Sequence, residues 1–489
     1  MSSDRWTPRV AIIGAGLGGI ATAVKLKQRG IDTFTVFEKS LGPGGTWWDN
    51  HYPGAECDVP SHLYSFSFKL ADWSRTHAGQ QEIQRYVEDV VDEFGIREHL
   101  RLGTEIRTVA WDDERRCHTL TMADGETFEA DVVTSALGML NVPRYPDWPG
   151  MDAFAGPMFH TARWEHEHDL SGKRVAVVGA GSSATQVVPA LAGVASEVVM
   201  FQREPAWVLP KGEHDYDEAE LAAFRRPFAK RRRRMELVWG LDRGNKAAVP
   251  GTDAAAAAHD LCLAHIEQHF GHDPELRATM TPDYPFRCKR IIVSSTFYPA
   301  VASDAVRLVP HGVTALTRDG VVDETGAEHP VDAVVLATGF NPWDLLSTID
   351  VIGRRGRRLH GVWGDEPEAF LGLTVAGFPN FFMLYGPNTN GGCVSFTLER
   401  QAEYVARAIG RMARRRLGVV EVRESVMTAY NRILTRRLDG MKAWEANCHN
   451  YYHGPTGKNV TQWPWGHIPY MVAARLLGAV TMRSWRLSR

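Results

Sequence analysis

The sequence predicts an α/β fold with two Rossmann-like dinucleotide-binding domains and a helical insertion in the second. Two glycine-rich motifs support this prediction: residues 14–19 have the sequence GAGLGG, and residues 179–184 have the sequence GAGSSA. Each follows an apolar run typical of a buried strand and precedes a stretch typical of a helix, as in a βαβ unit. The insertion is predicted at about 212–285, where the chain is charged, alanine-rich and poor in strand signals.

The first domain is expected to span residues 1–148 in its N-terminal part. Residues 10–13 predict its first strand, residues 33–38 its second, and residues 131–138 a further strand that ends in glycine. A proline-rich segment at 142–150 follows and is typical of a linker.

The second domain is expected to span residues 149–340. Its βαβ unit is predicted at about 170–205, and a buried strand at 331–339 again ends in glycine. Residues 341–489 are predicted to return to the first domain, because a βαβ domain of roughly 140 residues would cover a long dinucleotide only in part.

Composition narrows the class of protein. The 489 residues have a formal net charge of −3, which gives no sign of a nucleic-acid or anionic-membrane partner. We find no apolar run long enough to span a bilayer, and the polar N-terminal residues do not resemble a signal peptide. We therefore expect a cytoplasmic protein that acts on a small molecule; the sequence does not indicate its oligomeric state.

Cysteines and histidines suggest neither disulfides nor a metal site. The six cysteines are scattered without paired spacing, so we expect reduced thiols. The 19 histidines show no convincing ligand spacing, even in the densest cluster at 165–168, and we expect no metal. A basic run at 225–234 is interpreted as a solvated helix face, balanced by the acidic residues at 213–220, rather than as a nucleic-acid or membrane patch.

Different residues follow the two glycine-rich motifs at the same spacing. Nineteen residues past the last small residue, the first motif reaches Glu38 and the second reaches Arg203. An acid at this position hydrogen-bonds ribose hydroxyls, whereas an Arg accommodates a 2′-phosphate. We therefore expect FAD in the first domain and NADPH in the second.

A segment between the two domains has a pattern of its own. Phe154, Gly156, His160 and Trp164 have the spacing Phe-x-Gly-x3-His-x3-Trp, followed by Glu165. This pattern resembles the fingerprint of the flavin-dependent Baeyer-Villiger monooxygenases, which ends in Pro or Asp where this chain has Glu. Related N- and S-oxygenases usually have Phe or Tyr in place of the Trp. The resemblance implies that Gly156, His160 and Trp164 couple domain motion to catalysis.

Other motifs similar to those of the type I enzymes of this family occur along nearly the whole chain, least over the helical insertion. They are residues 44–47 (GGTW), 52–54 (YPG) with Asp58, 201–203 (FQR), 289–290 (KR), 337–340 (ATGF) and 386–389 (GPNT).

The resemblance implies a flavoprotein oxidoreductase that uses NADPH and FAD. It inserts one oxygen atom of O2 next to a ketone carbonyl through a C4a-peroxyflavin and gives an ester or lactone. Arg290 matches the family's active-site Arg, and Asp58 matches the Asp expected to orient it. A fixed cation suits the negative charge that develops on oxygen during this reaction. The identity of the ketone and the regiochemistry stay open.

The resemblance also implies a set of cofactor contacts. On the FAD side they are Gly14, Gly16, Gly19, Glu38, Thr46, Trp47, Asp58, Tyr64 and Ile106. On the NADPH side they are Gly179, Gly181, Ser182, Ser183, Gln186, Arg203 and Lys289, with Tyr451 where many members have a Trp that reaches the nicotinamide. Trp463, Trp465 and Tyr470 either line a pocket or pack in the core.

Three alternative functions stay open. An N- or S-oxygenase would use the same scaffold, but Trp164 and the Asp58 motif favour the Baeyer-Villiger reaction. An NADPH-linked flavoprotein disulfide reductase is disfavoured because the chain has no Cys-x-x-Cys motif. A non-enzymatic nucleotide-binding protein predicts no oxidation of NADPH, so bleaching of the flavin by NADPH would exclude it.

Overall fold

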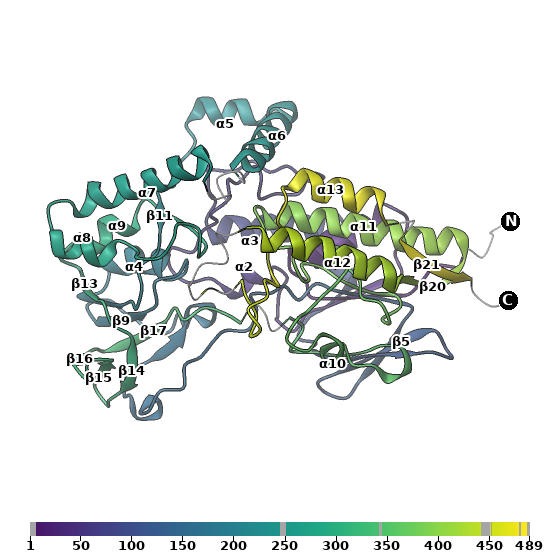
Figure 1. Ribbon diagram of the computed structural model, residues 1–489, viewed down its shortest axis with the longest axis horizontal. Coiled ribbons are helices and arrows are strands. Elements are labelled where there is room, and N and C mark those ends of the chain that lie inside the picture. The colour runs from purple at the N-terminus through teal and green to yellow at the C-terminus, as the bar shows by residue number, and fades with distance from the viewer. Residues whose placement is uncertain are drawn as a thin grey trace.

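The computed structural model describes residues 6–244, 251–341, 345–441, 450, 452–478 and 481–486. The chain forms two lobes side by side, each built around a five-stranded parallel sheet (Figure 1). We call the lobe that contains the N-terminal strand the first lobe and the other the second lobe. The predicted α/β fold with two Rossmann-like domains is confirmed.

The sheet of the first lobe is built from distant parts of the chain. In spatial order its strands are β19 (Phe381–Met383), β7 (Val132–Ser135), β1 (Val10–Ile13), β2 (Phe34–Phe37) and β3 (Leu100–Arg101). Helix α1 (Leu17–Lys27) packs on β1 and β2, and α11 (Val394–Arg415) packs on α1. Because β19 follows all the strands of the second lobe in sequence, the chain returns to the first lobe after building the second.

The other elements of the first lobe surround this sheet. They are α2 (Thr46–Asp49), α3 (Gln80–Glu93), the sheet of β18 (Asp350–Ile352), β4 (Ile106–Asp112), β5 (Cys117–Met122) and β6 (Thr127–Ala130), α10 (Leu359–Trp363), the pair β20 (Leu417–Val422) and β21 (Met482–Arg486), α12 (Glu424–Asp439) and α13 (His467–Leu476).

The sheet of the second lobe also combines strands from distant parts of the chain. In spatial order its strands are β13 (Val306–Val309), β10 (Glu197–Phe201), β9 (Arg174–Val178), β17 (Ala333–Leu336) and β8 (Met158–His160). Helices α4 (Ala184–Ala192) and α9 (Phe297–Val301) pack on each other. A three-stranded sheet of β14 (Val313–Leu316), β15 (Gly320–Asp323) and β16 (Glu328–Pro330) and the parallel pair of β11 (Val208–Leu209) and β12 (Ile292–Val293) complete it.

Glycine is required where each first strand turns into its helix. Gly14 has a φ of +103°, and a Cβ there would lie 2.7 Å from the carbonyl oxygen of Ala136. Gly179 has a φ of +130°, and a Cβ would lie 2.4 Å from the carbonyl oxygen of Ala337. Since both turns press against the neighbouring strand's end, a side chain would push the loop away from the sheet and distort the helix N-terminus behind it.

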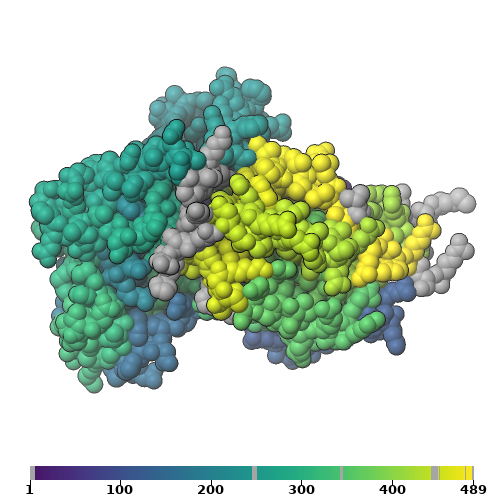
Figure 2. Space-filling view, viewed as in Figure 1, coloured from purple at the N-terminus to yellow at the C-terminus, as the bar shows by residue number. Residues whose placement is uncertain are grey.

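Between β11 and β12 the described residues form the helices α5 (Glu218–Phe224), α6 (Pro227–Gly244), α7 (Asp253–Phe270) and α8 (Pro274–Met280). Asp217, Thr252 and Asp273 cap α5, α7 and α8 through their side-chain oxygens, as expected for these residue types. Helices α5 and α6 stand above the boundary between the lobes (Figure 1). In the space-filling view, the teal residues of this region lie across the boundary from the light green and yellow C-terminal residues (Figure 2).

The basic run on α6 differs from the sequence prediction. Lys230 and Arg234 are buried, with side chains only 8% and 6% exposed. Arg234 donates hydrogen bonds to the carbonyl oxygens of Leu63 and Ser65 at 2.7 and 2.6 Å, which ties α6 to the first lobe. The interpretation as a fully solvated helix face is therefore wrong at these two positions. A guanidinium enters the interior here because backbone carbonyls accept from its Nη1 and the buried Glu399 carboxylate lies 3.6 Å from its Nη2.

The cysteines agree with the sequence prediction in part. Cys57, Cys117, Cys262 and Cys393 are free and buried. Cys288 takes part in a disulfide, so the expectation of reduced thiols throughout is wrong at this position. Among the described helices, none combines the length and apolar character that a membrane crossing requires.

Candidate functional site

A cavity of about 1560 Å³ extends between the two lobes, past both glycine-rich motifs. Sixteen of the residues expected from the sequence line it. They are Gly14, Gly16, Glu38, Thr46, Trp47, Asp58, Tyr64, Ile106, Gly179, Gly181, Ser182, Ser183, Gln186, Arg203, Lys289 and Arg290. Gly19 is not part of the described lining: a Cβ there would lie 1.8 Å from the carbonyl oxygen of Gly14, so this glycine permits the close packing of α1 on its own turn.

Glu38 lies at the end of β2, beside the first glycine-rich turn. One carboxylate oxygen accepts a hydrogen bond from the backbone N–H of Ala15 at 2.7 Å, and the other accepts one from the N–H of Ser40 at 2.9 Å. The side chain is buried, yet it lines the cavity. These two bonds fix the carboxylate at the place where a ribose hydroxyl of a bound dinucleotide would donate to it.

Trp47 and Tyr64 form a fixed aromatic wall on the first-lobe side. The indole N–H of Trp47 donates to the Tyr64 hydroxyl at 3.1 Å, and the rings meet edge to face at 5.7 Å. Burial raises the pKa of the Tyr64 phenol well above its usual value. The hydroxyl therefore stays protonated and does not act as an acid in the neutral pH range.

The second glycine-rich motif lines the cavity from the other lobe, together with two cations. Arg203 follows β10 and is exposed. Lys289 forms an ion pair with Glu204, and its ammonium lies 4.5 Å from the centre of the Tyr284 ring. The two cations therefore border the same end of the second βαβ unit, where a 2′-phosphate would need positive charge.

Asp58 and Arg290 come from opposite lobes and meet in the cavity. The guanidinium Nη2 of Arg290 donates to Oδ2 of Asp58 at 2.7 Å. The Asp58 side chain is 16% exposed and the Arg290 side chain is 47% exposed. The largely buried carboxylate therefore fixes a guanidinium that is partly exposed in the cavity. This arrangement presents an oriented positive charge between the two nucleotide motifs.

The fingerprint residues Gly156, His160 and Trp164 are not among the described residues that line the cavity. His160 is completely buried; its Nε2 donates to the carbonyl oxygen of Gly339 at 3.1 Å, and its Nδ1 accepts from the N–H of Ala162 at 3.1 Å. Burial lowers the pKa of His160 to about 4, so the ring is neutral. The same Gly339 carbonyl accepts the N–H of Arg144 at 2.8 Å, so His160 and the 142–150 segment are held by one carbonyl group.

Gly156 and Trp164 have packing contacts. A Cβ on Gly156 would lie 2.3 Å from the carbonyl oxygen of Asp332, so only glycine fits there. Trp164 is buried, and its ring packs edge to face on the Phe159 ring with 4.9 Å between the ring centroids.

Trp463 and Trp465 line the cavity, whereas Tyr470 is a core residue whose hydroxyl donates to the carbonyl oxygen of Leu371 at 2.8 Å. Tyr451 lies outside the described residues.

Within the described part of the chain, no group of three or more His, Cys, Asp or Glu side chains is arranged to hold a metal ion.

Comparisons with known proteins agree with this geometry. The sequence profile of a family described as pyridine nucleotide-disulphide oxidoreductase matches residues 11–218, which include both glycine-rich motifs. A Baeyer-Villiger monooxygenase from Pseudomonas aeruginosa is 41% identical over 93% of this chain and 87% of its own length. Another Baeyer-Villiger monooxygenase, from Streptomyces coelicolor, is 40% identical over 93% of this chain and 88% of its own length. The chain belongs to the Baeyer-Villiger monooxygenases.

Solved structures place this Baeyer-Villiger monooxygenase beside enzymes of the same architecture. An oxidized steroid monooxygenase bound to NADP matches with a TM-score of 0.89 at 27% sequence identity. The match covers 99% of this chain and 100% of the steroid monooxygenase chain. Cyclohexanone monooxygenase from Rhodococcus sp. Phi1 bound to NADP+ matches with a TM-score of 0.88 at 27% sequence identity. The match covers 98% of this chain and 99% of that enzyme's chain. The predictions of an oxidoreductase, a flavoprotein monooxygenase and the cofactors FAD and NADPH are confirmed.

The residues of this Baeyer-Villiger monooxygenase fit both cofactors. A Cβ on Gly45 would lie 2.9 Å from Cα of Gly16, so two glycines let this loop approach the α1 N-terminus closely, and both line the cavity together with Glu38. On the other lobe, a Cβ on Gly181 would meet no described atom within 4 Å, and the N-terminus of α4 faces the cavity beside Ser182.

Two functional contacts were missed by reasoning from the sequence. Tyr52 donates from its hydroxyl to Oε1 of Gln186 at 2.8 Å, and Nε2 of Gln186 donates to the carbonyl oxygen of Glu56 at 3.0 Å. The Gln186 side chain therefore joins the lobes as well as lining the cavity. The Tyr-Pro-Gly motif was a signal for this contact, since a Cβ on Gly54 would lie 2.5 Å from the Gln186 carbonyl oxygen.

Proposed function

We propose that this enzyme oxygenates a ketone, with O2 as oxidant and NADPH as electron donor. One oxygen atom enters the bond between the carbonyl carbon and its neighbour, and the other leaves as water, so that ketone, O2, NADPH and a proton give ester or lactone, water and NADP+. When bound, FAD carries the electrons from NADPH to O2. The Asp58–Arg290 pair in the cavity shared by both nucleotide motifs is the observation that supports this proposal.

Arg290 is the proposed catalytic cation. A guanidinium remains charged at any working pH, and a fixed charge stabilises negative charge on oxygen best in a site that excludes water. Asp58 accepts a hydrogen bond from Nη2 of this guanidinium, and both side chains line the cavity. Asp58 is therefore proposed to orient Arg290.

The remaining site residues are proposed to bind the cofactors. The FAD set is Gly14, Gly16, Gly19, Glu38, Thr46, Trp47, Asp58, Tyr64 and Ile106. The NADPH set is Gly179, Gly181, Ser182, Ser183, Gln186, Arg203, Lys289 and Tyr451. Gly156, His160 and Trp164 are proposed to couple the domains; the Gly339 carbonyl, which binds both His160 and Arg144 of the 142–150 segment, supports this for His160.

We further propose the domain division expected from the sequence: residues 1–148 and 341–489 bind FAD, and residues 149–340 bind NADPH. Strand β19 in the first sheet and strand β17 in the second support it. The cytoplasmic location stays a prediction.

The substrate class is tested by a screen of the purified holoenzyme. Linear, cyclic, aromatic and polycyclic ketones, with thioethers and amines for comparison, are supplied with NADPH, and both NADPH consumption and product mass are measured. We expect at least one ketone to give an ester or lactone that is one oxygen atom heavier. Products confined to sulfoxides or N-oxides would overturn the proposal in favour of the related oxygenases.

A further inference from the structure

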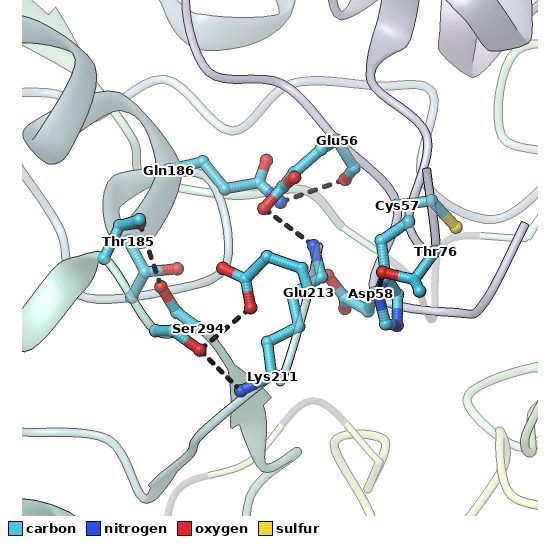
Figure 3. A network of polar contacts seen from close by, with 12 residues as sticks. Glu56, Cys57, Asp58, Thr76, Thr185, Gln186, Lys211, Glu213 and Ser294 are labelled. Atoms are coloured by element: carbon cyan, nitrogen blue, oxygen red, sulfur yellow. Dashed lines mark hydrogen bonds and ion pairs between the residues drawn. The ribbon is translucent and has the colours of Figure 1, made fainter. Parts of the chain in front are cut away.

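A second ion pair joins the lobes directly behind Asp58 and Arg290. The ammonium of Lys211 lies 2.6 Å from Oε1 of Glu56, which is separated from Asp58 by one residue. The Lys211 side chain is fully buried and the Glu56 side chain 22% exposed. Figure 3 shows Gln186, Glu56 and Lys211 in a continuous chain of contacts, with Glu213 close to the lysine.

Lys211 and Arg290 belong to one structural unit of the second lobe. Lys211 follows β11, and Arg290 precedes β12; the two strands pair through Val208 with Ile292 and Leu209 with Val293. The ladder continues beyond the strands, because the N–H of Ser294 donates to the Leu209 carbonyl at 2.9 Å. The two cations therefore move together with this strand pair.

The hydroxyl of Ser295 fixes the turn that contains Lys211. It accepts the N–H of Lys211 at 2.9 Å and donates to Oε2 of Glu213 at 2.8 Å. At the Arg290 end of the unit, the N–H of Ile292 donates to the Trp207 carbonyl at 3.0 Å. These bonds set the spacing between the Lys211 and Arg290 backbones before either side chain reaches the first lobe.

Glu56 and Asp58 are the matching anions of the first lobe. Both are attached to one short stretch of chain, and the Glu56 carbonyl is additionally held by Gln186 of the second lobe at 3.0 Å. Two cations at a fixed spacing thus meet two anions at a fixed spacing. A slide of one lobe past the other breaks both ion pairs together, whereas an apolar contact would tolerate it.

A neighbouring histidine adds no charge beside this pair at neutral pH. His77 is buried nearby, and burial, followed by the charge of Lys211, lowers its pKa to about 4, so the ring is neutral. A lysine taken fully out of water needs its anion, because an uncompensated buried charge is strongly unfavourable. The buried ammonium therefore favours the arrangement of lobes in which it reaches Glu56.

We propose that Lys211 and Glu56 are positioning residues that set the register between the lobes in which Asp58 orients Arg290. This inference rests on the proposed roles of Asp58 and Arg290. Neither Lys211 nor Glu56 is assigned a chemical step.

The test compares Lys211→Met, Lys211→Arg and the double variant Glu56→Gln/Lys211→Met in the holoenzyme. The measurements are FAD content, melting temperature, the anaerobic rate of flavin reduction by NADPH, kcat and KM for the ketone, and ester formed per NADPH consumed. The double variant leaves no unpaired buried charge, so it separates positioning from folding. Lys25→Met is the matched control, because Lys25 is also buried in an ion pair, with Glu399 at 3.4 Å, but does not line the cavity.

We expect Lys211→Met and the double variant to keep FAD while kcat and the ester yield per NADPH fall about tenfold, with a smaller effect on KM. Lys211→Arg should restore most of the yield, and Lys25→Met should leave it unchanged. In an Asp58→Asn background, Lys211→Met should have little further effect, because residues that act through one another are not additive.

Three results would overturn the inference. One is an unchanged ester yield per NADPH in the double variant, which would leave the pair a stability role alone. Another is a full additional loss from Lys211→Met in the Asp58→Asn background. The third is wild-type ester formation by Asp58→Asn, which would overturn the proposed role of Asp58 and this inference together, whereas the first two leave the role of Asp58 intact. Ketone oxygenation itself is tested separately, by the substrate screen.

Discussion

At the scale of single residues, the site consists of charges held by specific partners. Glu38 is fixed by two backbone N–H groups, and Arg290 by Asp58. Arg203 differs because it is exposed at the end of its strand, and it lines the cavity from the rim. We therefore expect it to discriminate between the two nicotinamide cofactors without affecting the flavin.

Arg203→Ala should raise the KM for NADPH about tenfold or more relative to the KM for NADH, since it removes a charge-assisted contact that only the 2′-phosphate makes. Steady-state kinetics with both cofactors measures this. Arg318→Ala, an exposed Arg of the same lobe that does not line the cavity, is the control. Equal increases for NADPH and NADH would show that Arg203 does not contact the phosphate.

His118 predicts a pH dependence of stability. It is completely buried, its Nε2 donates to the Pro379 carbonyl at 3.0 Å, and burial lowers its pKa to about 4. The unfolded chain binds this proton near pH 6.5, so the stabilisation is complete above that pH and is lost as the pH falls toward 4.

For this one group, the free energy of unfolding should fall by about 2 kcal/mol between pH 7 and pH 5. Urea titrations at both pH values compare the wild type with His118→Gln, which retains a donor for the Pro379 carbonyl, and with His311→Gln on the surface. The His118→Gln variant should lose less stability on acidification than the wild type. An identical loss in both proteins would contradict the assignment.

At the scale of secondary-structure elements, local signals predicted the turns well and the long-range contacts poorly. The βαβ units, Glu38 and Arg203 follow from spacing along the chain, because glycine turns and strand ends are local features. The Lys211–Glu56 pair has no local signal, since its members are 155 residues apart in the sequence. The burial of Lys230 and Arg234 did have one: with Val238 they form a stripe at intervals of four residues on α6.

Gly179→Ala tests the second nucleotide turn. The added Cβ would lie 2.4 Å from the Ala337 carbonyl at a φ of +130°, so we expect displaced motif residues, retained FAD and a KM for NADPH raised about tenfold or more. Gly193→Ala at the end of α4 is the matched control, because a Cβ there meets no described atom within 4 Å. Flavin absorbance and steady-state kinetics distinguish the two variants, and equal KM values would rule out the proposed strain.

At the scale of the whole molecule, the two lobes contribute one member each to the central ion pair. Asp58 lies in the first lobe and Arg290 in the second, and the resemblance to the family, rather than any pattern in the sequence, indicated that they would meet. Gln186 also joins the lobes, because its amide donates to the Glu56 carbonyl of the first lobe at 3.0 Å. The Asp58–Arg290 pair therefore forms only while the lobes keep their register.

The most direct test of the account is a comparison of the two half-reactions in Arg290→Ala. Flavin reduction by NADPH, followed anaerobically by absorbance, depends on nucleotide binding, whereas ester formation, followed by product mass, depends on the charge in the cavity. We expect Arg290→Ala to retain flavin reduction and to lose ester formation, so that the electrons of the consumed NADPH reduce O2 to hydrogen peroxide. Ester formation at the wild-type rate in this variant would contradict the central role of the Asp58–Arg290 pair.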